Sequence, residues 1–158
     1  MIEKEELLSI VPHRGKMLLL SRVIEYDLMK RTLTAECDVT EDCLFYDPAL
    51  GGVPAWVSFE YMAQTIGALS GIWVRENGEE PKLGFILSIS SMHIGLPFFK
   101  AGSKVEIRVK EAGYLDQVHN FDGIALLNGR KVMEGKLTVM DASDEQIKSL
   151  LKEYDSIG

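Results

Sequence analysis

Glu60 is the residue whose surroundings most clearly require a chemical explanation. It is the only charged side chain between Asp47 and Arg75, in a stretch that is otherwise apolar or small. Taking a carboxylate out of water is costly unless partners satisfy it. We therefore expect Glu60 to be paired or to act as an acid in proton transfer. Gln64 follows at i+4, so its amide lies on the same helix face, where it is a candidate to line the site.

A Gly- and Pro-rich loop and a long helix position this carboxylate. The loop covers residues 45–54, and residues 55–75 read as one helix that Asn77–Pro81 stops. The apolar residues of this helix lie on nearly all of its sides, which predicts burial at the centre of a domain. Polar and small residues interrupt the apolar run, so we do not expect a membrane span.

The remaining chain predicts one antiparallel sheet wrapped round this helix. A short helix over 3–10 precedes a strand over 17–26, which pairs as a hairpin with a strand over 32–40. The other expected elements are strands over 82–91 (extended by 92–96), 104–112, 118–127 and 131–140, and a C-terminal helix over about 142–155. Asn128-Gly129 is the strongest hairpin turn signal. This is an α+β arrangement in a single domain, 1–158.

Composition and charge exclude several classes of function. The net charge of -7 opposes binding to nucleic acid and to anionic membranes. The first residues lack the apolar run of a secretory signal. Cys37 and Cys43 fit neither a metal-binding spacing nor a disulfide framework. We predict a cytoplasmic protein without metal or cofactor.

Several motifs, in order, resemble the hotdog-fold 3-hydroxyacyl-acyl-carrier-protein dehydratases. The similarity covers about residues 7–140, and it is closest to the ApeP-like thioester dehydratases of aryl polyene biosynthesis. The motifs that carry it are Pro12-His13-Arg14, Arg22-Val23, Tyr46-Asp47-Pro48, Gly51–Trp56, Glu60–Gln64, Leu96-Pro97-Phe98 and Ala101-Gly102-Ser103.

This resemblance implies a dimer with active sites at the subunit interface. In the family, a histidine of one subunit removes the α-proton of the thioester, and a helix acid of the other protonates the departing β-hydroxyl. The helix acid corresponds to Glu60, and the backbone amide that polarises the thioester carbonyl corresponds to Ala55. Gly52, Trp56 and Gln64 are the other expected substrate-binding residues. Trp56 is also a candidate for the core, with Met17, Phe85 and Ile86.

The chain departs from the family at the histidine position, which falls on Tyr46. A phenol ionises near pH ~10, so it is a poor general base near neutrality. Asp47, next door, is the alternative base, or else a turn residue before Pro48. His13, beside a turn-forming proline, is expected to be structural. His93 and His119 lie on predicted strands, where either is a candidate to face the site.

Three functions follow from these residues. In the first, the chain is an active dehydratase on acyl-carrier-protein thioesters of fatty acid or aryl polyene biosynthesis, with Asp47 or Tyr46 replacing histidine. Alternatively, it is a catalytically impaired subunit that pairs with a histidine-bearing dehydratase. The third function is an acyl thioesterase, because one fold hosts several reactions. The expected partners are an acyl carrier protein and a second subunit, identical or related.

Overall fold

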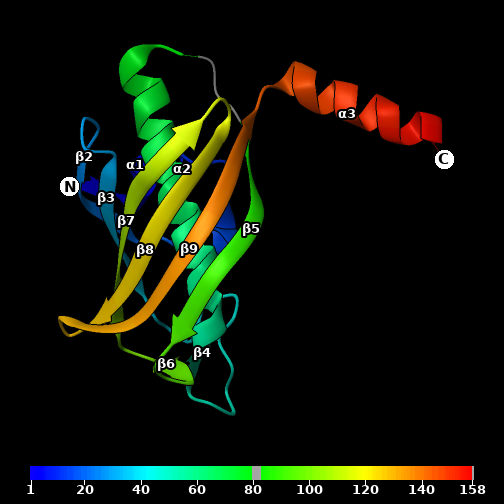
Figure 1. Ribbon diagram of the computed structural model, residues 1–158. Helices are drawn as coiled ribbons and strands as arrows, with labels where there is room; N and C mark the ends of the chain where they lie inside the picture. Colours follow the sequence, from blue (N-terminus) through cyan, green and yellow to red (C-terminus); the bar gives the residue numbers. More distant parts are fainter. Residues whose placement is uncertain (80–82, 158) are drawn as a thin grey trace.

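A computed structural model describes residues 1–79 and 83–157 of the chain. The long helix α2 (Ser58–Asn77) lies along one face of a curved, seven-stranded antiparallel sheet (Figure 1). This is the α+β hotdog arrangement that the sequence predicts. Parts of the predicted stop signal and of the strand expected from residue 82 fall on 80–82, outside the described residues.

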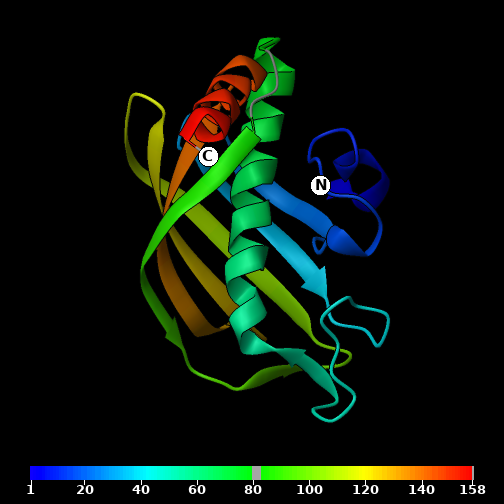
Figure 2. The same cartoon turned by 90° about the vertical axis from the view of Figure 1, so that its right-hand side faces the viewer.

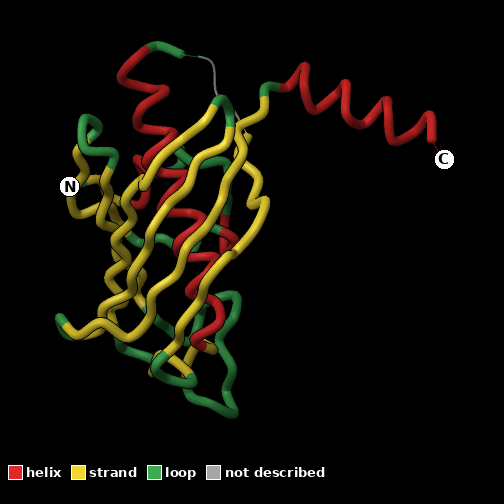
Figure 3. The backbone as a smooth tube through the Cα atoms, in the orientation of Figure 1, coloured by secondary structure: helices red, strands yellow, loops and turns green. Residues whose placement is uncertain are grey.

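The sheet order is β1-β2-β3-β7-β8-β9-β5, so β1 and β5 are its edges. A separate two-stranded ribbon, β4 with β6, lies where α2 begins (Figure 3). The strands are β1 (Ile2–Glu3), β2 (Arg22–Asp27), β3 (Thr32–Asp38), β4 (Gly52–Pro54), β5 (Leu83–Ile94), β6 (Phe98–Lys100), β7 (Lys104–Leu115), β8 (Val118–Leu127) and β9 (Arg130–Ala142). The helices besides α2 are α1 (Lys4–Leu7), α3 (Asp144–Ile157) and 3-10 turns at Gly15–Met17 and Ala55–Val57.

Alternation and turn chemistry explain the sheet. Leu33, Ala35 and Cys37 on β3 are all buried, because alternate residues of a strand face the same side. Asn128 and Gly129 join β8 to β9 with φ of 53° and 76°, the left-handed values that a tight hairpin turn requires. Both features were predictable from sequence.

The central helix is close to its predicted bounds. It begins at Ser58 after the 3-10 turn, and Gly78 ends it with a left-handed φ of 63°. One side of α2 packs on β3, β7 and β8. Residues 10–19 contact another side of it, so α2 lies between the sheet and the N-terminal segment (Figure 2).

The N-terminal segment differs from its prediction. The strand expected over 17–26 begins only at Arg22, because the amide of Leu19 donates to the side chain of Gln64 instead of to a neighbouring strand. Leu18 and Leu20 are nevertheless buried. The helix expected over 3–10 ends at Leu7.

Four residues considered for the core are exposed. Trp56 is 53% exposed and Met17 is 55% exposed; each lies in a one-turn 3-10 helix. Phe85 and Ile86, each 38% exposed, lie on the edge strand β5. The prediction of core packing was therefore wrong for all four within this chain.

The C-terminal helix α3 projects past the β5 edge of the sheet (Figure 1). Leu150, Leu151 and Tyr154 on this helix are exposed. Across the described ranges 1–79 and 83–157, we find no helix with the length and apolar character needed to span a membrane.

Gly71 is where the N-terminal segment approaches α2 most closely. A Cβ at Gly71 would lie 2.1 Å from the carbonyl oxygen of Ile10, whereas a Cβ at Gly67 would meet nothing within 4 Å. Close packing therefore requires glycine at Gly71 but not at Gly67.

We expect Gly71→Ala to destabilise the protein by about 1–3 kcal/mol, the usual cost of overpacking. This cost outweighs the gain of about 0.8–1 kcal/mol that alanine brings to a helix interior. Gly67→Ala is the matched control and should be stabilising, since only the helix gain applies. Urea unfolding of both variants measures the difference, and equal stabilities would contradict the packing role of Gly71.

A charged cluster joins β7, β8 and β9 near the C-terminal end of α2, where its Arg31 lies over Trp73. Glu111, whose side chain is 5% exposed, accepts from Arg31 Nε at 2.6 Å and lies 2.5 Å from His119 Nδ1. His119 Nε2 is also 3.2 Å from Asp141 Oδ2. Burial raises the pKa of Glu111, but the hydrogen bonds from Arg31 and His119 outweigh it and hold this pKa below its usual value.

We expect Glu111→Gln to lower stability near pH 7 by about 1.5–3 kcal/mol, as hydrogen bonds to a buried charge are lost. Because the folded pKa is lowered, this contribution is present above the unfolded value of 4.5 and is lost as the pH falls through the folded pKa. Unfolding at pH 7, 5 and 3 should therefore show wild type and variant converging in acid.

Glu106→Gln is the control on the same strand. Its carboxylate pairs with Arg108, and the two side chains are 31% and 54% exposed, so the loss should stay below about 1 kcal/mol. A constant difference between wild type and Glu111→Gln at all three pH values would contradict the linkage.

Candidate active site

Glu60 lies in the first turn of α2, where the helix dipole favours a negative charge. Its side chain is 28% exposed, as expected for a residue on a helix that is predicted to be buried. Gln64 Nε2 donates to Glu60 Oε1 at 3.2 Å, one helical turn further on. The carboxylate therefore has a fixed neighbour and remains reachable from the surface.

Gln64 anchors the N-terminal segment beside this carboxylate. It is 1% exposed; its Nε2 also donates to the Met17 carbonyl, and its Oε1 accepts from the Leu19 amide, both at 2.8 Å. Both N–H donors of the amide are thus used within the chain. This geometry supports a positioning role rather than the predicted direct contact with substrate.

His13 faces Glu60 from the same N-terminal segment. Its Nε2 lies 3.8 Å from Glu60 Oε1, and both side chains are less than one-third exposed. Its Nδ1 is buried, and no residue of the described chain gives it a hydrogen-bond partner. Arg14 Nη1 holds the loop by donating to the carbonyls of Val11 and His13, each at 2.8 Å.

The turn beside Pro12 suggested a structural histidine, but folding brings His13 to the acidic residue. The sequence signal that could have placed His13 near α2 is the apolar run Met17–Leu20, which follows Pro12-His13-Arg14. Apolar residues of such a run are expected to pack against the buried helix. The sequence does not specify that the covered face is the one that carries Glu60.

Asp47 occupies the start of a tight turn. Its Oδ1 accepts from the Ala49 amide at 2.9 Å, and its backbone carbonyl accepts from Leu50 and Gly51. Its own amide donates to the Gly52 carbonyl at 2.8 Å. The geometry supports the turn alternative for Asp47, because its carboxylate is engaged within the loop.

The other predicted residues of this loop also have structural partners. Tyr46 is half-buried against the core. A Cβ at Gly52 would lie 2.1 Å from the Phe99 carbonyl oxygen, so glycine allows β4 to approach β6. The Ala55 amide donates to the Pro97 carbonyl at 3.0 Å and is not free to polarise a thioester in this conformation.

An aromatic group surrounds the start of α2. Trp56 lies edge-on to Phe45, with ring centroids 5.6 Å apart, and stacks on Phe59 at 6.2 Å. Trp56 is exposed and both phenylalanines are half-buried, so the group offers apolar surface just before Glu60 along the chain.

The remaining histidines do not join Glu60. His119 belongs to the cluster with Glu111 and Asp141, and His93 is exposed on β5, opposite Glu134 of β9. Among residues 1–79 and 83–157, no group of three or more His, Cys, Asp or Glu side chains is arranged to hold a metal ion.

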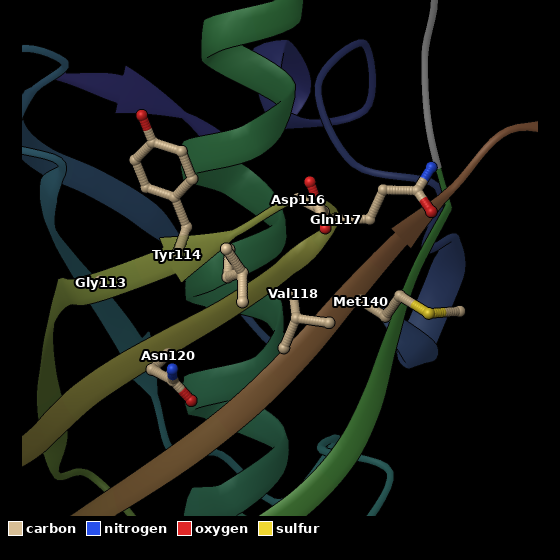
Figure 4. Close-up of a pocket in the computed structure, with 8 residues that line it drawn as sticks. Gly113, Tyr114, Asp116, Gln117, Val118, Asn120 and Met140 are labelled. Carbon is tan, nitrogen blue, oxygen red and sulfur yellow. The ribbon is translucent and has the colours of Figure 1, made fainter.

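A hollow on the surface lies elsewhere. It measures about 520 Å³ and is lined by the β7–β8 hairpin and Met140, with Tyr114, Asp116 and Gln117 among its side chains (Figure 4). Neither Glu60 nor His13 lines it. The candidate site is therefore placed at Glu60 and His13, whose carboxyl and imidazole groups are 3.8 Å apart, and not at this open hollow.

Known proteins are similar to this chain in sequence and in fold. A 3-hydroxyacyl-[acyl-carrier-protein] dehydratase FabZ of Bartonella quintana is 27% identical over 141 residues, which cover 88% of this chain and 89% of the relative. The structure of the dehydratase heterocomplex ApeI:P from Xenorhabdus doucetiae matches with a TM-score of 0.84 and 25% identity, covering 92% of this chain and 96% of that one.

A thioesterase-type structure from Ralstonia eutropha matches with a TM-score of 0.58 and 19% identity, covering 75% of this chain and 82% of that one, which shows a shared fold alone. The family of ApeP-like dehydratases, described as ApeP dehydratase, matches residues 5–152, nearly the whole chain. The chain belongs to the ApeP-like dehydratase family.

Proposed function

We propose that this chain is a subunit of a 3-hydroxyacyl-acyl-carrier-protein dehydratase in fatty acid or aryl polyene biosynthesis. Membership of the ApeP-like family and the similarity to FabZ dehydratases support this class of reaction. The observation that carries the proposal is Glu60, a partly buried carboxyl group whose position is held by Gln64.

Dehydration of a 3-hydroxyacyl thioester needs a base that acts at Cα of the substrate and an acid that acts on the hydroxyl group of the adjacent Cβ. The base takes the proton on Cα, and the C–H electron pair becomes the Cα=Cβ double bond. The Cβ–O bond breaks, and the oxygen leaves as water with a proton from the acid. In this proposal Glu60 supplies that proton, which is the role that positioned general acids play.

The thioester carbonyl is polarised by the start of the helix. The Ala55 amide is already bound to Pro97, so the next amides, of Trp56 and Val57, are the better donors. The first backbone N–H groups of a helix have no carbonyl acceptor within the helix. The aromatic group around Trp56 then provides apolar surface for the acyl chain.

The base comes from a second chain in this proposal. Asp47 is engaged in its turn, and a phenol such as that of Tyr46 is a poor base near neutral pH. A related dehydratase with a histidine at the family position would place that base opposite Glu60 of this chain. The ApeI:P heterocomplex, whose fold this chain shares, supports such a mixed pair.

The exposed edge strand β5 supports pairing with a second subunit, whether that subunit is identical or a related dehydratase. Ile86, Ile89 and Ile94 pair in register with Val139, Leu137 and Met133, which are buried on the helix side of the sheet. The three isoleucines share that side, yet they remain 38–42% exposed. An apolar inner face that its own helix leaves open is a surface for a second subunit.

The thioesterase alternative differs in its product. Its support is the fold shared with thioesterase-type structures, and fold does not determine reaction. Incubation with a 3-hydroxyacyl carrier thioester separates the two, because dehydration keeps the thioester and forms an enoyl group, whereas hydrolysis releases a free acid.

We expect Glu60→Gln to fold normally and to lose about 10²–10⁴-fold of the dehydration rate, the usual contribution of a positioned general acid. Asp47→Asn is the matched control, because asparagine keeps the Oδ1 acceptor of the turn and should leave the rate nearly unchanged. Enoyl-thioester formation is measured by mass spectrometry. A Glu60→Gln rate within twofold of wild type would assign Glu60 a structural role, and a large loss in Asp47→Asn would restore Asp47 as the base.

Co-expression tests the second subunit. We expect this chain to co-purify with a histidine-bearing dehydratase of the same fold, and Glu60→Gln to abolish the site to which the partner contributes its histidine. The mirror-image site, which has only Tyr46 and Asp47 of this chain at the base position, should be weak or dead. Failure to co-purify, together with full dehydration by this chain alone, would favour a self-paired enzyme.

A further inference from the structure

We propose that His13 is a second catalytic residue of this site, donating a hydrogen bond through Nε2 to the β-hydroxyl oxygen that Glu60 protonates. This inference rests on the proposed dehydratase function and adds a residue to it. His13 comes from the same chain as Glu60, so it is distinct from the histidine that a partner subunit would contribute as base.

The separation of the two side chains supports a shared oxygen. Nε2 of His13 and Oε1 of Glu60 are 3.8 Å apart, which is too long for a direct hydrogen bond. One oxygen atom between them can lie ~2.8–3.0 Å from both, the normal distance for O–H···O and N–H···O bonds. The departing hydroxyl is an oxygen that meets this requirement.

The buried Nδ1 of His13 indicates which ring nitrogen carries the proton. A neutral imidazole has one N–H donor and one bare acceptor nitrogen. No described residue accepts a hydrogen bond from Nδ1, and an orphaned buried N–H is rarer and costlier than an under-satisfied acceptor. The proton is therefore placed on Nε2, the nitrogen that faces Glu60.

This arrangement makes His13 a donor and leaves the base to another group. With Nε2 protonated, no lone pair of His13 points at the site, so the α-proton passes to the base of the second subunit. As the Cβ–O bond breaks, the oxygen takes the Glu60 proton and leaves as water. The N–H of His13 stabilises the charge that develops on that oxygen and then faces the new carboxylate.

The backbone that carries His13 is held on both sides by α2, the helix of Glu60. Before His13, the carbonyl of Ile10 lies against Gly71; after it, Met17 and Leu19 bond to Gln64. Arg14 closes the loop between these anchors. Donor and acid thus share one support, which is what precise placement in a catalytic site requires.

Two substitutions separate the possible roles of His13 in the dehydratase as purified with its second subunit. His13→Gln keeps an amide N–H at about the position of Nε2 but does not titrate, whereas His13→Leu removes the donor. We expect a kcat loss on the order of 10²-fold for His13→Leu and of less than ~10-fold for His13→Gln. Thermal unfolding checks that both variants fold.

Equal and severe losses in both variants would make His13 a general base and overturn the donor role. Activities close to wild type in both would make it structural, again overturning the proposal. An inactive wild-type protein would instead count against the dehydratase function itself. Imidazole ¹⁵N NMR gives a readout independent of turnover. We expect His13, assigned by comparison with His13→Gln, to be protonated on Nε2 and bare on Nδ1; the opposite tautomer would overturn the proposal.

Discussion

The buried amide of Gln64 is the interaction on which the site depends. It holds Glu60 by one hydrogen bond and the backbone of Met17 and Leu19 by two more. Leaving a buried polar group unpaired costs about 1–3 kcal/mol, so these bonds are broken together only at high cost. One side chain thereby ties the path of the N-terminal segment to the orientation of the acid. A change in the packing of the N-terminal segment would therefore also change the position of Glu60.

Local patterns were sufficient for most of the fold. The buried helix, the alternation along β3 and the Asn128-Gly129 turn follow from residue types and spacing that act over a few positions. The partial burial of Glu60 was predictable for the same reason, because a residue on a helix that is apolar on nearly all sides is buried together with that helix. Leu18–Leu20 read as a strand because a sequence pattern does not show that a distant glutamine takes the amide of Leu19.

The site was harder to predict than the fold because its parts meet through long-range packing. His13 and Glu60 are separated along the chain by β2, β3, β4 and the segments that connect them, and no periodicity links the two residues. Besides Trp56, Glu60 and Gln64, the family resemblance pointed to residues 46–55. There Asp47, Gly52 and Ala55 are engaged in the turn, the β4–β6 ribbon and a backbone hydrogen bond. Trp56 and the residues of β5 were misjudged for another reason: exposed apolar residues are of the same types as core residues, so residue type alone does not separate the two.

The sheet order also has a practical consequence for handling the protein. β1 and β5 are opposite edges, and α3 follows directly from β9, the neighbour of β5. A fluorescent or affinity tag fused after α3 would therefore lie on the β5 side of the sheet, at the far end of a helix that projects from it. The same tag placed ahead of β1 would be separated from β5 by the full width of the sheet, which makes it the suitable position for pull-down and energy-transfer measurements.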